Sequence, residues 1–215
     1  MEKEQFEECC RLNRENLYKS EEGYLHNLWL SKAKGDLAGM ARAYDNLGRT
    51  YLRYDNDKAE GMFNKALDIN RKLNNKEGMA RNYDGLGFLF SDKGEYDKAE
   101  DMYVSEMKIY KEFDDEHGLQ MVYMNLGDTY RCKREFNKAE ENLKKSLAIN
   151  KKMEKMGKRN LLPYCYLKLG EIYEEQNNKE KAREYLQRAA TLFKKNGAIK
   201  IANRIQSKID EPQKK

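Results

Sequence analysis

A leucine followed directly by a glycine recurs at a nearly constant interval along this chain of 215 residues. The four pairs are Leu47-Gly48, Leu86-Gly87, Leu126-Gly127 and Leu169-Gly170. A tyrosine stands three residues before each leucine, and an aromatic residue stands three residues after each glycine. Self-similarity at a fixed period of about 20 to 50 residues is typical of stacked structural repeats, so this interval constrains the fold more than any other feature.

Each repeat predicts two helices. The tyrosine, leucine, glycine and second aromatic residue are spaced so that they share one stripe of a first helix. Later in the repeat an alanine inside a charged triplet precedes a large apolar residue by four positions, as Ala59 precedes Phe63, and this spacing predicts a second helix. Small residues let two helix backbones approach closely. Short polar turns join the helices, and we expect Gly94, in one such turn, to have a positive φ angle.

This pattern resembles that of the tetratricopeptide repeat family, W-x2-L-G-x2-Y followed by A-x3-F, with tyrosine in place of the tryptophan. The period exceeds the usual length of about 34 residues. In this respect the chain is similar to kinesin light chains, to Leu-Gly-Asn-type mitotic adaptors and to many bacterial repeat proteins. The resemblance covers residues 40–195 and implies an all-α fold, a right-handed α-solenoid of helical hairpins with a C-terminal capping helix.

The repeat frame divides the chain into segments. We expect a degenerate N-terminal repeat at 1–39, repeats at 40–78, 79–118, 119–160 and 161–196, a capping helix at 197–210 and a tail at 211–215. Phe6, Cys9, Cys10 and Leu12 are expected to line the first helix of the degenerate repeat. The cap carries an apolar stripe formed by Ala198, Ile201, Ala202, Ile205 and Ile209. Such a helix closes the last apolar surface of a solenoid.

Composition narrows the class of protein. Charged residues make up 37% and hydrophobic residues 39%, but the 15 Tyr and 7 Phe supply core anchors that a disordered chain lacks. No run approaches the roughly 20 apolar residues that cross a bilayer, and the charged N-terminus does not resemble a secretory signal. The adjacent cysteines Cys9 and Cys10 do not indicate a framework of disulfide bonds. Cys132 and Cys165 are expected to be small packing residues. These features predict a cytoplasmic protein with reduced thiols and no membrane span.

Little in the sequence indicates catalysis or a cofactor. The two histidines, His26 and His117, lie in unrelated segments, and no HExxH, GxSxG or P-loop motif occurs. The cysteines do not have the paired spacing of a zinc site. The net charge of +5 comes from 42 Lys and Arg mixed with 37 Asp and Glu, which does not indicate nucleic-acid binding. We therefore expect no enzyme activity, no metal, no cofactor and no nucleic-acid partner.

The first helices of the repeats carry the candidate binding residues. In the family that this chain resembles, these helices line a concave groove that contacts a bound peptide. Transferring that frame places the following residues in the groove: Arg42, Asn46, Arg49, Arg53, Arg81, Phe88, Met121, Met124, Asn125, Tyr164, Leu167, Lys168, Glu171 and Glu175. Asp45 is expected on the same face. The order predicts a partner with acidic residues at the arginine end, apolar anchors in the middle and basic residues at the glutamate end.

Two functions are compatible with this pattern. The first is a non-enzymatic adaptor that binds an extended or helical segment of a protein partner in the groove. The alternative is a self-assembling scaffold that forms homo-oligomers through its N-terminal helix or its convex face. Glu106 departs from the repeat pattern, because the equivalent positions hold the small residues Ala66, Ser146 and Ala189. It is expected either to loosen its repeat or to pair with a nearby base.

Overall fold

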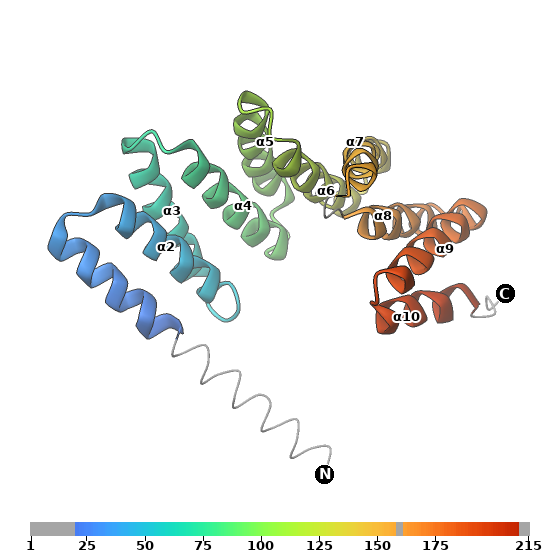
Figure 1. The fold of residues 1–215 in the computed structure, drawn as a ribbon, viewed down its shortest axis with the longest axis horizontal. Helices are drawn as coiled ribbons and strands as arrows, with labels where there is room; N and C mark the ends of the chain where they lie inside the picture. Colours follow the sequence, from blue (N-terminus) through green and yellow to red (C-terminus); the bar gives the residue numbers. More distant parts are fainter. Residues whose placement is uncertain (1–19, 158–160, 211–215) are drawn as a thin grey trace, which may run out of the picture. The chain divides into compact units, whose positions relative to one another are not determined.

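A computed structural model describes residues 20–157 and 161–210 (Figure 1). The regular structure of these residues is helical, beginning with a segment at 20–34. The helices that follow are α2 (Leu37–Tyr51), α3 (Asn56–Lys72), α4 (Lys76–Asp92), α5 (Tyr96–Glu112), α6 (Glu116–Cys132), α7 (Phe136–Lys155), α8 (Leu162–Glu175), α9 (Lys179–Lys195) and α10 (Ile199–Asp210). The predicted all-α fold class is confirmed. The predicted helix with Phe6, Cys9, Cys10 and Leu12, and the tail at 211–215, lie outside the described residues.

The chain folds as two compact units, the first ending at Ile109 and the second beginning at Tyr110, so that α5 contributes to both. In the first unit α3 packs against α2 and α4. In the second unit α7 packs against α6 and α8, and α9 packs against α8 and α10. Short turns between successive helices produce the antiparallel hairpins that the two helices of each repeat predict.

The turns are specified by single residues. Five helices begin at an Asp or Asn whose side chain accepts a hydrogen bond from a backbone N–H of the first turn, which satisfies a donor that the helix leaves unpaired. These capping residues are Asp36, Asp55, Asn75, Asp115 and Asn178. Gly94 has a φ of 74°, as predicted. Asn74, Asp114, Arg134 and Asn177 also adopt positive φ in equivalent turns, which the sequence did not reveal.

The conserved spacing of small residues positions the helices. In the first unit the fully buried ring of Phe63 on α3 lies between Gly48 of α2 and Gly85 of α4. A Cβ atom would lie 2.8 Å from this ring at Gly48 and 2.5 Å at Gly85, closer than side-chain carbons pack. In the second unit Gly127 receives the smaller side chain of Leu143 in the same manner. The glycines therefore set how closely successive helices approach.

Glu106 on α5 is buried, with 3% of its surface exposed. Its Oε2 atom has no hydrogen-bond partner in the described part of the chain, and no ion pair to a base forms there. Burial raises the pKa of Glu106 to about 9, the charge of Asp84 adds to this shift, and Arg49 opposes it. The expectation that Glu106 pairs with a base is thus wrong, because the neighbouring arginine is already paired with two aspartates.

Candidate binding site

Helices α6 and α8 lie side by side in the second unit. Asp128 of α6 pairs with Lys168 of α8, and Arg131, one turn further along α6, pairs with Glu175, two turns further along α8. Because the two pairs ascend together, the helices run parallel. A residue of α6 and a residue of α8 that stand at the same number of positions from Leu126 and Leu169, respectively, therefore lie at the same level along the two helices. We call each such pair a row.

Two such rows are apolar. Met124 of α6 corresponds to Leu167 of α8, two residues before the leucine, and Met121 corresponds to Tyr164 one turn earlier. Met121 is 40% exposed and Tyr164 is 43% exposed, while Met124 and Leu167 are half-buried. The Tyr164 ring is held edge-on against Phe193 of α9 at a centroid distance of 4.9 Å. We call these four side chains the apolar face of the second unit.

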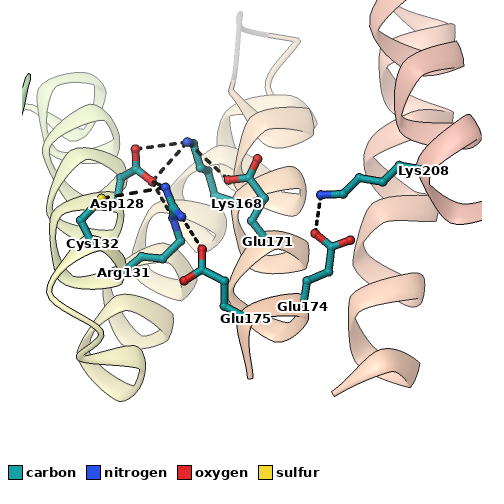
Figure 2. A network of polar contacts seen from close by, with 8 residues as sticks. All are labelled: Asp128, Arg131, Cys132, Lys168, Glu171, Glu174, Glu175 and Lys208. Atoms are coloured by element: carbon teal, nitrogen blue, oxygen red, sulfur yellow. Dashed lines mark hydrogen bonds and ion pairs between the residues drawn. The ribbon is translucent and has the colours of Figure 1, made fainter. Parts of the chain in front are cut away.

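A network of ion pairs lies next to the apolar face, toward the C-terminal ends of α6 and α8 (Figure 2). Arg131 binds Asp128 at 3.0 Å and also donates to Glu175. Lys168 binds Asp128 at 3.1 Å and lies 3.5 Å from Glu171. Burial alone would lower the pKa of Arg131, but the charge of Asp128 and the hydrogen bond to Glu175 raise it above its ordinary value. The network therefore joins two helices and leaves each of these charges compensated.

A separate ion pair joins α8 to the capping helix. Lys208 of α10 donates to Glu174 of α8 at 2.6 Å (Figure 2). Glu171, Glu174 and Glu175, where the sequence predicts the basic part of a ligand, each lie beside a cation of the protein itself. Sequence reasoning missed these pairs, although acids and bases about one repeat apart on successive first helices were a signal that could have identified them.

The first unit has a different polar cluster. Arg49 of α2 lies 3.3 Å from Asp45 and 3.3 Å from Asp84 of α4, and it donates to the backbone oxygen of Arg81 at 3.0 Å. Asn82 donates to Asp45 at 2.7 Å from a buried position. Asp45 was expected on an open face but is buried by these contacts, with 9% exposed. Burial raises the pKa of Asp84, and the charge of Arg49 opposes this shift.

The other predicted groove residues are placed as follows. Arg42, Arg53 and Arg81 are exposed, Phe88 is 55% exposed, and Asn46 is half-buried, all in the first unit. In the second unit Asn125 is half-buried, and its backbone oxygen accepts a hydrogen bond from the Thr129 hydroxyl. Arg49, predicted to contact the acidic part of a ligand, pairs with Asp45 and Asp84.

The described cysteines differ from one another. Cys165 is buried, as expected, beside the Ser146 hydroxyl at 3.3 Å, and burial raises the pKa of its thiol. Cys132 is exposed at the edge of the ion-pair network, so its prediction as a packing residue is wrong. The described residues contain no group of three His, Cys, Asp or Glu that could hold a metal ion. None of the described helices is long and apolar enough to cross a membrane.

Comparison with known sequences identifies the family. The sequence matches the tetratricopeptide repeat over residues 39–112, 77–152 and 118–195. The chain belongs to the tetratricopeptide repeat family. Repeats of this family typically mediate protein–protein interaction. No curated protein matches the sequence.

Solved structures share the fold. BtubC (BKLC) from P. vanneervenii aligns with a TM-score of 0.69 and 17% identity over 93% of this chain and 94% of that chain. A putative kinesin light chain with nearly identical TPR-like repeats from Podosopora anserina gives 0.70 and 15% over 89% and 94%. The apo form of RapI gives 0.76 and 21% over 90% of this chain, which spans 54% of RapI. At these identities the likeness is one of fold.

Proposed function

We propose that this tetratricopeptide repeat chain is a non-enzymatic adaptor that binds a segment of a protein partner on the apolar face of the second unit. The observation that carries the proposal is the grouping of Met121, Met124, Tyr164 and Leu167 on two parallel helices, with substantial exposure. Methionine and tyrosine side chains provide adaptable and rigid apolar contacts respectively, and both are enriched where proteins bind one another. The second unit thus offers anchoring positions for apolar side chains.

The charged residues beside this face are already paired with one another, so the partner does not need complementary charges there. Because Arg131, Lys168 and the neighbouring acids neutralise one another, a ligand gains little by replacing these pairs. We infer that apolar contacts supply most of the affinity and that added salt weakens binding only slightly. Arg42, Arg53, Arg81 and Phe88 are proposed as the contacts that the first unit provides.

Site-specific photocrosslinking tests the proposal. A photoreactive phenylalanine analogue at Tyr164 should capture a partner protein in native extract, and capture should be lost when Met124→Glu and Leu167→Glu are added. The double change Lys151→Glu and Lys155→Glu on α7 is the matched control, since both lysines are exposed and neither forms an ion pair within the described chain. Circular dichroism verifies that every variant remains helical. Equal capture by the two doubly substituted proteins would exclude the apolar face.

One observation favours the alternative of self-assembly. In the helical segment at 20–34, Leu25 is 45% exposed and Trp29 is 63% exposed, with His26 stacked on the indole at a centroid distance of 6.1 Å. An exposed tryptophan is a common anchor of protein interfaces. If a second copy covers it, sedimentation velocity will show a mass that rises with concentration, and Trp29→Glu will remove the rise. A monomer at every concentration would exclude this alternative.

A further inference from the structure

The basic residues of the chain are unevenly distributed. Residues 176–210 contain nine Lys and Arg but only three Asp and Glu, whereas the whole chain has a net charge of +5. The excess of positive charge therefore resides in the last hairpin helix, α9, and in the capping helix, α10. Neither the apolar face nor the ion-pair network accounts for this excess.

Some of these cations lie on the side of α9 that faces α10. Gln187 of α9 donates to Gln206 of α10 at 3.2 Å, which marks the seam between the two helices. Arg183 precedes Gln187 by four residues and Lys194 follows it by seven, so both share the Gln187 side of α9. Arg183 also lines a hollow of about 920 Å³ together with Lys208 and Ile209 of α10, and the acids Glu174, Glu180 and Glu184 line the same hollow. The cations of α9 thus border α10.

The outer face of α10, turned away from Gln206, carries two further cations. Lys200 and Arg204 are one turn apart and exposed, opposite the buried Ala202 and Ile205. Ile199 and Ile201, on either side of Lys200, are 47% and 38% exposed. We call the following side chains of α10 the basic end face: Ile199, Lys200, Ile201 and Arg204.

The cations of the basic end face differ from the other basic residues of these helices. Lys208 pairs with Glu174, and Arg188 pairs with Glu184. Lys200 and Arg204 form no ion pair with any residue that the structure describes. Unpaired like charges on one surface repel one another, and carboxylates from a partner would replace that repulsion with attraction.

We propose that the basic end face binds an acidic segment of a protein partner, with Ile199 and Ile201 contacting apolar side chains placed between its carboxylates. This surface is separate from the apolar face of the second unit. A partner held there would be sensitive to salt, because exposed ion pairs are screened. One chain could then hold two partner segments by different forces.

The surroundings favour protein over nucleic acid or membrane. Single-stranded nucleic acid requires aromatic side chains on which bases stack. The aromatic residues of α9 are occupied, since Tyr185 stacks on Tyr173 at 5.4 Å and Phe193 is buried. A helix that lies in a membrane surface inserts its apolar face, but α10 packs Ala202 and Ile205 against α9.

Fluorescence anisotropy with a labelled short peptide of alternating glutamate and leucine tests the proposal. We expect the double change Lys200→Glu and Arg204→Glu to weaken binding at least about tenfold, because two attractions become repulsions. The pair Lys151→Glu and Lys155→Glu, with the same spacing and the same change in net charge, should leave the affinity within about twofold. Raising the salt from about 50 to about 300 mM should weaken the wild type markedly.

Other outcomes overturn the proposal. Equal weakening by the two doubly substituted proteins would indicate nonspecific charge attraction. A control peptide has glutamine in place of every glutamate, and equally tight binding of that peptide would exclude carboxylate recognition. Tighter binding of oligo-thymidine or of phosphatidylserine vesicles, with the same dependence on Lys200 and Arg204, would assign the face to nucleic acid or membrane. The variant Met124→Glu and Leu167→Glu should bind the acidic peptide normally, so failure of the proposed function leaves this test intact.

Discussion

The two units place different residues at the same positions of the repeat. Two residues before the repeat leucine, the first unit has Asp45 and Asp84, whereas the second has Met124 and Leu167. In the first unit the two aspartates share one cation, Arg49. In the second unit the acids lie further along the helices, where Arg131 and Lys168 compensate them.

The difference assigns different tasks to the two surfaces. Carboxylates at the central position of the first unit are used up in internal contacts, which extend through Asn82 to Asn70 as a buried chain of hydrogen bonds. In the second unit the acidic residues lie about one turn nearer the helix C-termini, and the central position holds apolar side chains instead. An exposed apolar face beside saturated ion pairs is suited to binding, whereas a buried polar chain is suited to fixing the packing of helices.

Glu106 provides the largest expected effect. A glutamate in an unfolded chain has a pKa of about 4.3, and the folded pKa is about 9. Between these values the folded state holds a proton that the unfolded state has released, so the wild type loses stability as the pH rises. Relative to the wild type, Glu106→Gln should gain about 4 kcal/mol in free energy of unfolding from about pH 5 to about pH 8.

Urea denaturation at both pH values measures this gain. Glu180→Gln, at an exposed position of α9, is the control and should give a curve parallel to that of the wild type. If Glu106→Gln is also parallel to the wild type, the first unit does not bury a neutral acid and its contrast with the second unit is smaller than we describe.

Gly85 gives the next effect. The Phe63 ring prevents any side chain at this position, whereas the equivalent position of the second unit holds Lys168. Gly85→Asn should cost about 2 kcal/mol through overpacking. In a Phe63→Leu background, which resembles the second unit with its Leu143, the added cost should fall below about 1 kcal/mol. A double-mutant cycle by chemical denaturation measures the coupling, and additive costs would contradict this explanation.

Removing a cation tests the electrostatic difference between the units. Arg49→Met leaves two carboxylates of the first unit without a cation and should cost about 1.5 kcal/mol, a figure reduced by the partial exposure of the pair. Lys168→Met in the second unit should cost about 0.5 kcal/mol, because Arg131 remains beside Asp128. Thermal unfolding of the two variants compares these values directly. Equal costs would show that the clusters are equivalent.

The fold was predictable because its determinants are local and repeated. The spacing of tyrosine, leucine and glycine identifies each first helix without knowledge of its neighbours, and the family match covers the same residues. The positive φ angles at Asn74, Asp114, Arg134 and Asn177 were not predictable from composition, since none of them is glycine. There the turn geometry overrides the preference of the residue for negative φ.

The polar part of the candidate site was predicted less well. The periodicity of a helix predicts which of its side chains are exposed. The pairing of its charges, in contrast, depends on a second helix about one repeat away in the sequence. Asp45 becomes buried only because Asn82 and Arg49 converge on it. Gly85 stands at the position that holds Asn46 and Asn125 in other repeats, because the Phe63 ring leaves no room for a side chain there. A pattern within one helix does not contain this contact between helices.

The smallest expected effect concerns the ion pair that joins the capping helix to α8 in the second unit. Lys208 connects α10 to Glu174 of α8 through an exposed pair, so Lys208→Ala should lower the free energy of unfolding by only about 0.3 kcal/mol. High salt should remove the difference, since screening already weakens the pair in the wild type. Lys151→Ala, at an exposed position of α7 without an ion pair in the described chain, is the control for loss of charge without loss of a connection between helices. A larger loss for Lys208→Ala that persists in salt would mean that the pair positions the capping helix, and the second unit, like the first, would then rely on a polar contact to fix its packing.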